Sequence, residues 1–414
     1  MRRAWLVVVH VLVVPVLLAR AQEAEASPLQ MFGIGGDSPA RGGTGVADTT
    51  GFDGVYLNPA GLAGVPRRRL TVGTLLGTFQ LEGVERTVDA AVGIEVGIAL
   101  PVPLGGWLED RIGFALGVYF PSKLLNKARA PRPGTPFYAL LENRAQTVGI
   151  QVGLGVKLSE SWSLGASVLS LAALKGHIHV SSDPAGRFTT TSEEQLLTDL
   201  APIAGVRWRA GPSLATGVTV HASSQSAYDI LVTNELGEVL PVTLPELRFA
   251  GVAQYDPLTV AAEAAWRPSS RWLISGQLAW ENWSRFPLPT ENPVKDMPAQ
   301  EPTGYHDVVI PRVGAAWTSA GASGYQLILR GGYYFAWSPA PEMTGQQALL
   351  DNHRHVFSLG FGLAAPGQAL PFYLDVWLQL HALVPRHNDR PEGVPDVDTR
   401  GSIFAGGLTV GVDL

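Results

Sequence analysis

A chain of 414 residues can hold several soluble domains or one large barrel. Hydrophobic residues make up 46% of it and charged residues only 16%, whereas a soluble chain usually carries about 25% charged residues, so the composition disfavours an ordinary soluble protein. The formal net charge of −6, without any block of basic residues, argues against nucleic-acid binding, and the absence of cysteine excludes disulfides and thiolate chemistry.

The first 21 residues have the anatomy of a secretory signal peptide. Arg2 and Arg3 form a charged start, an apolar run extends from Trp5 to Leu18, and Ala19-Arg20-Ala21 matches a cleavage site. An uncleaved anchor is the alternative, but the apolar run is shorter than the ~20 residues that span a bilayer. We therefore expect residues 1–21 to be removed and the protein to be exported.

Beyond the signal, no stretch approaches ~18 uninterrupted apolar residues, so a helical membrane protein is not expected. Strand periodicity is present instead. Between Val148 and Leu158 every second residue is aliphatic, and the residues between them are Gly, Gln or Lys. A soluble sandwich also alternates, but its polar face carries more Lys, Glu and Thr than this one does. We predict an all-β fold, a transmembrane antiparallel β-barrel.

The strand count points to about fourteen. Short connections alternate with long polar or Pro-rich ones, which cover roughly 121–146, 179–198, 223–246, 285–308, 336–353 and 385–401. The segment Leu247–Trp266 looks like two strands divided at Asp256-Pro257, which would make the count odd, so we predict one long strand with a bulge there. The barrel then covers residues 67–414, and its last strand can pair with the first, near Arg69–Leu81.

Residues 22–66 differ from the barrel. They are rich in Gly, Pro, Asp and Thr and lack sustained alternation, yet they carry apolar side chains such as Phe32, Val46 and Leu57. A flexible tail is the alternative, but this apolar content disfavours it. Because the glycine-rich inner faces of the strands leave room, we predict that this segment is a hatch, or plug, folded into the lumen.

Motifs in the hatch and in later strands point to a family. Gly36–Asp48 reads G-D-S-P-A-R-G-G-T-G-V-A-D, and Leu57–Leu62 reads L-N-P-A-G-L. Farther on, Arg267–Phe286 ends in W-E-N-W-S-R-F, and Tyr305–Trp317 and Leu329–Tyr334 read as the following strands. In this order, behind a signal and before a barrel, they resemble the FadL/TodX family of outer-membrane transporters of long-chain fatty acids and aromatic hydrocarbons. The likeness spans the chain from about residue 27 to its end.

The resemblance implies a fourteen-stranded barrel with a hatch in the outer membrane of a Gram-negative bacterium. It implies passive uptake of hydrophobic small molecules, namely fatty acids or hydrocarbons, with detergent able to take their place. The protein would be a monomer surrounded by outer-membrane lipids, with no cofactor. The family's most recognisable mark is matched by the gate residues Asn58, Pro59 and Ala60. The alternative is a related barrel with a non-transport role, such as a scaffold or a secretion accessory protein.

The resemblance also implies a sideways exit through a kinked third strand. Here the third strand is Ile112–Phe120, which contains Gly113 and Gly117 and is followed by Pro121. Glycine in a strand marks weak pairing or a close approach of another backbone. We expect the lateral opening to involve Gly113, Gly117, Tyr119 and Phe120.

An apolar cluster lies in the long connection 121–146. It consists of Phe137, Tyr138, Leu140 and Leu141. Exposed apolar clusters tend to mark binding sites, so we predict an outer apolar groove here. The alternative is that the loop packs against the rim of the barrel.

The inward-facing positions of the strands carry ionisable residues, among them Arg312, Arg330, Asp375 and Glu281. A lone buried charge is costly, so we expect these lumen charges to pair with charges of the hatch and to anchor it. The other possible role is a clamp by Arg312 or Arg330 on the carboxylate of a fatty acid.

Catalysis and metal binding have little support. No Gly-x-Ser-x-Gly nucleophile elbow occurs, and the glycines at 33–36 do not follow a strand. Asp351, His353 and His355 have a spacing that a metal site could use, but such loops usually hold none. We predict no catalytic residue, no metal and no cofactor.

Overall fold

The computed structural model describes residues 28–84, 88–122, 135–141, 148–183, 187–235, 246–288, 302–321, 324–343, 349–391 and 393–414. The expected signal peptide, 1–21, and the expected first residues of the hatch, 22–27, lie outside the described residues. Within the described ranges, no helix is long and apolar enough to cross a membrane.

Strands make up most of the described chain. They are β1 (Arg69–Glu82), β2 (Ala91–Pro101), β3 (Ile112–Pro121), β4 (Gly149–Lys157), β5 (Trp162–Ser182), β6 (Phe188–Arg209), β7 (Leu214–His221), β8 (Ser224–Glu235), β9 (Leu247–Asp256), β10 (Thr259–Ser269), β11 (Trp272–Glu281), β12 (Val308–Thr318), β13 (Gln326–Ala336), β14 (Arg354–Ala365), β15 (Phe372–Asn388) and β16 (Val397–Asp413). Short helical turns precede β1, namely α2 (Pro28–Phe32), α3 (Asp37–Ala40), α4 (Gly54–Leu57) and η1 (Pro59–Gly64). Two others, η2 (Gly106–Leu108) and η3 (Trp283–Arg285), lie in connections.

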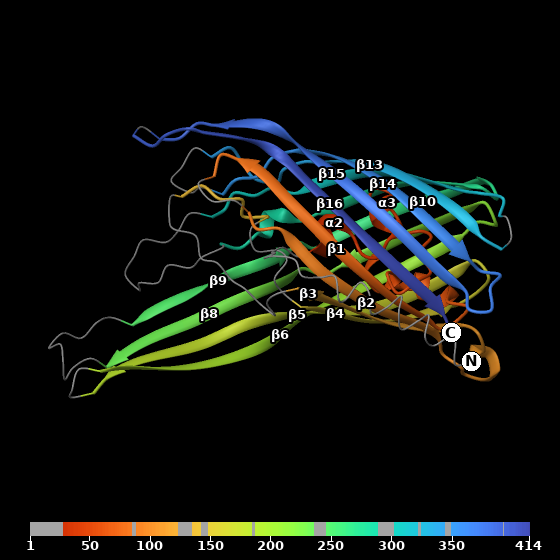
Figure 1. Cartoon of the computed structure of the whole chain (residues 1–414), viewed down its shortest axis with the longest axis horizontal. Helices are drawn as coiled ribbons and strands as arrows, with labels where there is room; N and C mark the ends of the chain where they lie inside the picture. Colours follow the sequence, from red (N-terminus) through yellow and green to blue (C-terminus); the bar gives the residue numbers. More distant parts are fainter. Residues whose placement is uncertain are drawn as a thin grey trace.

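Fourteen of the sixteen described strands close into one antiparallel barrel (Figure 1). Each strand of the ring pairs with the next one in sequence, except that β7 pairs with β10. The ring closes where β1 pairs with β16, from Arg69↔Asp413 to Glu82↔Arg400. The predicted barrel, its strand number and the pairing of the last strand with the first are therefore confirmed.

The two faces of each strand differ as the alternation predicts. In β4, Ile150, Val152 and Leu154 are 42%, 42% and 49% exposed, whereas Gln151 between them is 1% exposed. Because lipid surrounds the outer face of a membrane barrel, apolar side chains there need no protein partner. The small and polar residues face inward.

The prediction of one bulged strand from Leu247 to Trp266 is wrong. The structure divides this segment into β9, which pairs with β8, and β10, which pairs with β7 and β11. The interruption includes Pro257, which has no N–H to donate to a neighbouring strand. The number of strands in the ring stays even because β8 and β9 form a hairpin inserted between β7 and β10.

Two predicted loops are largely strand, and a third, 223–246, contains β8. β5 and β6 pair as far as Ser182↔Phe188, which covers most of 179–198, and β15 and β16 pair as far as Asn388↔Val397. The outer half of β5 also pairs in parallel with β8. As a result β6, β5, β8 and β9 extend beyond the ring as one sheet (Figure 1).

The hatch lies inside the barrel (Figure 1), where η1 contacts β3 to β6 and α3 contacts β13 to β15. Inward glycines make this possible. A Cβ at Gly165 would lie 2.1 Å from the carbonyl carbon of Pro59, and one at Gly332 would lie 2.2 Å from that of Arg41. Any larger residue would push the hatch off the wall, so the glycine-rich inner face matches the backbone of the hatch.

Candidate functional site

Asn58-Pro59-Ala60 joins α4 to η1 against the barrel wall. The Asn58 side chain is fully buried, and its Nδ2 donates to the carbonyls of Val46 at 2.7 Å and Val206 at 3.1 Å. Its Oδ1 accepts the N–H of Ala60 at 3.0 Å. Pro59 stands at the start of η1, where a missing N–H costs nothing. The segment thereby ties two parts of the hatch to β6.

A chain of ion pairs seats α3 on the wall. Arg330 of β13 donates from Nε to Asp37 of the hatch at 2.5 Å and from Nη1 to Asp375 of β15 at 2.6 Å. Asp37 also pairs with Arg41, which reaches Asp48 at 3.1 Å. Burial alone would raise the pKa of Asp37, but the two guanidinium groups beside it hold that pKa well below its usual range. Since Arg330 already binds two carboxylates, its contacts are those of an anchor.

Two carboxylates that sequence reasoning did not single out also hold the hatch. Glu263 of β10 accepts the N–H groups of Gly45 at 2.6 Å and Val46 at 2.7 Å, and Glu95 of β2 accepts that of Gly35 at 2.9 Å. Each is the single acidic residue of an apolar strand, and this pattern could have predicted them as functional residues. What the pattern could not show is the hatch backbone that they face.

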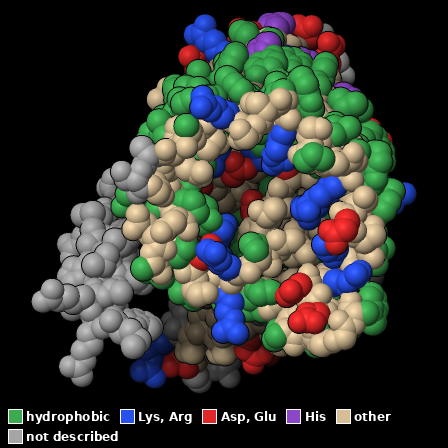
Figure 2. Space-filling model, turned by 90° about the vertical axis from the view of Figure 1, so that its right-hand side faces the viewer, with side chains coloured by type: hydrophobic (Ala, Val, Ile, Leu, Met, Phe, Trp, Pro, Cys, Tyr) green, Lys and Arg blue, Asp and Glu red, His purple; other side chains and the backbone are tan. Residues whose placement is uncertain are grey.

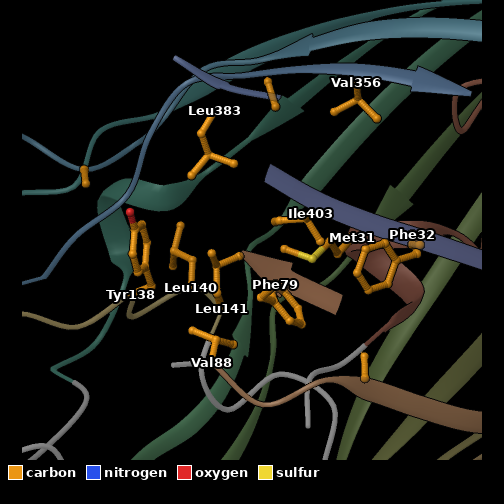
Figure 3. Packing of buried hydrophobic residues seen from close by; sticks show 14 of the residues in the cluster. Met31, Phe32, Phe79, Val88, Tyr138, Leu140, Leu141, Val356, Leu383 and Ile403 are labelled. Atoms are coloured by element: carbon orange, nitrogen blue, oxygen red, sulfur yellow. The ribbon is translucent and has the colours of Figure 1, made fainter. Parts of the chain in front are cut away.

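A hydrophobic cluster lies in the outer half of the lumen. In this outer-mouth cluster, Met31 and Phe32 of α2 lie close to Phe79 and Ile403 of the wall and to the side chains of segment 137–141 (Figure 3). The cluster therefore reaches from the mouth of the barrel to the hatch, and it is inside the protein.

The segment predicted to form an exposed outer groove belongs to this cluster. Phe137, Tyr138, Leu140 and Leu141 are at most 8% exposed, so the structure contradicts the expected groove on the outside. The carbonyl of Phe137 accepts the N–H of Leu350 at 2.8 Å, and the Tyr138 hydroxyl donates to the carbonyl of Glu82 at 3.1 Å. These bonds turn the segment inward, where its apolar side chains escape water.

The expected kink in the third strand is also not found. β3 pairs with β2 from Gly93↔Pro121 to Pro101↔Gly113. On its other side it pairs with β4 from Ile112↔Val156 to Tyr119↔Gly149. Along these described strands the wall is continuous, because every residue from 113 to 119 has a partner on both sides.

The glycines of β3 have a different role from the one expected. A Cβ at Gly113 would lie 1.9 Å from the carbonyl oxygen of Leu62, and one at Gly117 would lie 3.3 Å from the ring of Phe52. Both glycines thus allow the hatch to pack closely against the strand. Tyr119 is buried on the same inner face, whereas Phe120 is 45% exposed on the outer one.

A larger cavity, of ≈350 Å³, opens on the end of the barrel that carries the short turns and the C-terminus. Figure 2 looks onto this end and shows a central hollow with basic and acidic side chains around it. The charged residues that line the cavity are Asp37, Asp48, Asp53, Arg69, Arg267, Arg271, Arg330 and Asp375. The cavity on this side of the hatch is therefore polar, whereas the outer-mouth cluster lies on the other side.

The smaller cavity, of ≈80 Å³, lies between α2 and the inner faces of β7 and β10 to β13. Arg312 and Glu281 both line it. The Arg312 guanidinium lies 4.1 Å from the centre of the Tyr334 ring, and Glu281 accepts the indole N–H of Trp283 at 2.7 Å. The four predicted lumen charges thus divide in pairs, with Arg330 and Asp375 at the larger cavity and Arg312 and Glu281 at the smaller.

Asp351, His353 and His355 do not gather into a metal site. His353 accepts the N–H of Ser338 at 2.8 Å, and a ring nitrogen of His355 lies 2.9 Å from the Tyr333 hydroxyl. Within the described ranges, the one group of His and acidic side chains close enough to share an ion is exposed on the β15–β16 hairpin and consists of His387, Asp389 and Asp396.

Comparisons with known proteins identify the family of this chain. The model of a family described as outer membrane protein transport protein (OMPP1/FadL/TodX) matches residues 15–370. Similar solved structures include a FadL homologue from Pseudomonas aeruginosa, which is 13% identical, with 95% of this chain and 99% of that chain covered and a TM-score of 0.58. The toluene transporter TodX of Pseudomonas putida is 13% identical, with 93% of this chain and 99% of that chain covered and a TM-score of 0.55. The toluene transporter TbuX of Ralstonia pickettii is 14% identical, with 92% of this chain and 99% of that chain covered and a TM-score of 0.52. At these identities the likeness concerns the fold. No curated protein matches the chain.

Proposed function

Because this chain belongs to the OMPP1/FadL/TodX family of outer membrane transport proteins, we propose that it is an outer-membrane channel for the passive uptake of hydrophobic small molecules. The substrates would be fatty acids or aromatic and aliphatic hydrocarbons. The barrel closes within one chain, which fits a monomer surrounded by the lipids of a Gram-negative outer membrane. Neither catalysis nor a cofactor is needed for such passage.

The outer-mouth cluster is the observation that carries this proposal. A water-filled pore has a polar interior, whereas here apolar side chains line the lumen from segment 137–141 to Met31 and Phe32 of the hatch (Figure 3). An apolar solute gains free energy by leaving water for such surroundings. Entry of a ligand requires these side chains to move apart, since the cluster is closed in this structure.

The hatch is the proposed gate. It separates the apolar outer half of the lumen from the polar cavity below it, so a solute must displace it. Asn58 and its hydrogen bonds to Val46 and Val206 would hold the closed position, with Pro59 and Ala60 beside it. The charges that seat α3 would restore this position after passage.

We propose a sideways exit at β3 as the last step. The inner side of this strand is formed by Gly113, Ala115 and Gly117, which offer nothing to fill the space once the hatch leaves. Because β3 is paired on both sides in this structure, the opening has to follow hatch movement, near Tyr119 and Phe120. The other route is straight through the larger cavity.

Uptake by liposomes tests the proposal. Purified protein should speed the uptake of a neutral hydrophobic dye, 1-N-phenylnaphthylamine captured by an internal acceptor, over protein-free liposomes. Ala405→Trp should reduce that gain at least ~fivefold, because Ala405 belongs to the outer-mouth cluster and the added ring takes up space that a ligand needs when the cluster opens. Phe404→Trp is the matched control, since Phe404 is the next residue and is 46% exposed on the lipid face.

A scaffold or secretion accessory would behave differently. Its wall could equally be closed at β3, but dye uptake with the wild-type protein would not exceed that of protein-free liposomes. That result would overturn the transport proposal, and an Ala405→Trp variant as active as wild type would overturn the route through the outer-mouth cluster. Unheated and heated electrophoretic mobility shows that each variant is folded.

A further inference from the structure

Two arginines of β6 lie against the same point of the hatch. Arg207 and Arg209 are two residues apart, so their side chains leave the inner face of the strand, whereas Trp208 between them is 38% exposed on the lipid face. A Cβ added to Gly64, at the end of η1, would lie 3.3 Å from the Nη2 of each arginine. Apart from hatch residues that adjoin Gly64 in sequence, no other described atom lies within 4 Å of that position. The wall and the hatch thus leave a space between two guanidinium groups.

Arg207 turns one edge of its guanidinium toward this space. The residue is 2% exposed, and its Nη1 donates to the carbonyl of Thr49 at 2.9 Å. Its Nε is buried and has no partner in the described part of the chain. Nε and Nη2 form the edge of a guanidinium that binds two oxygens of one anion, as they do between Arg69 and Asp413 in this barrel. This edge of Arg207 is therefore a pair of donors that needs an acceptor.

Positive charge accumulates at this point. Besides Arg209, Arg267 at the end of β10 lies close enough for its charge to act on Arg207. The carboxylate whose charge also acts there is Asp48, which is already bound by Arg41 at 3.1 Å and by Arg267 at 3.5 Å. Like charges that are close together repel one another, and burial strengthens the effect. An additional anion would therefore be attracted by three guanidinium groups at once.

Glu263 lies in the same row of the wall but does not neutralise Arg207. Gly217 of β7 is opposite Arg207 on one side and opposite Glu263 on the other, so one strand separates the two side chains. The hatch passes over that strand, because a Cβ at Gly217 would lie 2.4 Å from the carbonyl oxygen of Val46. Glu263 in turn accepts the N–H groups of Gly45 and Val46. Its charge is therefore directed at the hatch backbone.

The site is reached from the larger cavity. Thr49 and Arg267 line that cavity, which opens on the end of the barrel seen in Figure 2. The charge of Glu160, in the turn after β4, interacts with that of Arg209 at this end. The Glu160 side chain is 88% exposed, however, and is paired with Lys157 at 2.8 Å. A small anion can therefore approach from this end of the barrel.

We propose that Arg207, Arg209 and Arg267 bind a phosphate-type oxyanion between the wall and the η1 end of the hatch. A tetrahedral oxyanion presents several charged acceptors, which match the forked donors of neighbouring guanidinium groups. It would also offset the repulsion among three like charges. The inference goes beyond the proposed uptake function, since this ligand is hydrophilic and lies on the side of the larger cavity, away from the outer-mouth cluster. Both inorganic phosphate and the phosphate of a lipid headgroup have the required chemistry.

Equilibrium dialysis of the full-length barrel against radiolabelled phosphate tests this site, in dodecyl maltoside, a detergent without phosphate. Wild-type protein should bind phosphate saturably. Gly64→Ala keeps every charge but places a methyl group between the two guanidinium groups, so it should weaken binding at least ~tenfold. Arg209→Gln should weaken it to a similar extent, through loss of charge-assisted bonds. Gly105→Ala, where a Cβ has nothing within 4 Å, and Arg271→Gln, in an exposed turn at the same end, are the matched controls and should change binding less than ~twofold.

Neither test variant should unfold the barrel. The methyl group in Gly64→Ala meets only the flexible ends of arginine side chains, and Arg209 is exposed. Electrophoretic mobility before and after heating checks the folding. Absence of saturable binding to wild type, or unchanged binding in either variant, overturns the assignment. Nanodiscs of phosphatidylglycerol distinguish the two sources: phosphate binding that persists there assigns the site to the free anion, and binding that is lost there assigns it to a lipid headgroup.

Discussion

Arg330 connects three parts of the chain at the scale of one residue. Its guanidinium lies on β13 and binds Asp37 of the hatch and Asp375 of β15. Its side chain is 7% exposed, so water cannot replace either contact. The seating of the hatch thus depends on few side chains, and single substitutions can test it.

Replacing Arg330 by Gln should release the hatch. The variant leaves Asp37 and Asp375 without their shared cation. The seated hatch should lose about 3 kcal/mol of stability, the low end for a broken buried pair, because the Asp37 side chain is 38% exposed. Amide hydrogen exchange of residues 37–48 should speed up. Arg400→Gln is the control, since its pair with Glu82 is 64% and 60% exposed and should contribute at most ~1 kcal/mol. Equal amide exchange rates of residues 37–48 in the two variants would contradict the anchoring role of Arg330.

The hatch should also respond to pH through Asp53, which lines the larger cavity. Burial raises the pKa of Asp53 to about 6. A raised folded pKa means that the seated hatch binds the proton more tightly than the released one, so this stabilisation is lost as pH rises through 6. Asp37 stays ionised throughout, because its pKa is held low.

Proteolysis measures this effect. Papain should cleave the hatch about tenfold more slowly at pH 5 than at pH 7.5, after normalisation to an unstructured peptide. Asp53→Asn should remove that part of the pH dependence. Comparing the two profiles separates Asp53 from Glu95 and Glu263, which also touch the hatch. A variant with the wild-type profile would refute the assignment.

At the scale of elements, β3 is the strand that the proposed sideways exit would use. Its pairing to β2 and β4 is complete in this structure, and its inner glycines are in contact with the hatch. Strand and hatch are therefore coupled. A sideways exit requires that the pairing of β3 break after the hatch has moved.

A disulfide across β3 and β4 should block a sideways exit. The chain has no cysteine, so Val118→Cys with Ile150→Cys, which are opposite each other and face outward, can be oxidised selectively. Oxidation should lower dye uptake at least ~threefold, and reduction should restore it, because a closed cross-link prevents separation of the strands. Phe361→Cys with Val376→Cys on the far wall is the matched control. Undiminished uptake with β3 locked would favour passage through the larger cavity.

At the scale of the whole molecule, the ring and the β8–β9 hairpin are separable. His221 and Thr259 are opposite each other in β7 and β10, so the ring closes without the residues between them. The hairpin instead joins β5 and extends beyond the ring (Figure 1). Its removal should leave the barrel intact.

Deleting residues 224–256 should give a folded barrel. The remaining Ala222, Ser223, Pro257 and Leu258 then form a four-residue hairpin connection, which is a common length. Heated and unheated samples should keep their difference in electrophoretic mobility. Deleting 259–281, which removes two strands of the ring, should abolish that difference. Loss of the folded form in the first deletion would mean that the barrel needs the β8–β9 hairpin for its stability.

The sequence by itself determined the barrel and the hatch, whereas the even strand number was reached through a wrong division of Leu247–Trp266. These are local or repeated patterns: lipid selects an aliphatic residue at every second position, as at Ile150 and Val152, and packing of the hatch backbone selects glycine, as at Gly165. The family was equally readable from the motifs around Asn58, and the family match confirms that the chain belongs to it.

The tertiary structure decided what depends on contacts between distant segments. Whether segment 137–141 faces solvent or the lumen depends on β1 and on residues 349–350, and whether Leu247–Trp266 is one strand depends on β5 and β8. Which arginine forms the ion pairs is likewise decided by contacts: Arg312 and Arg330 are both inward residues of neighbouring strands, but only Arg330 meets Asp37 and Asp375. A sequence pattern shows which way a side chain points, and the folded barrel shows what it meets there.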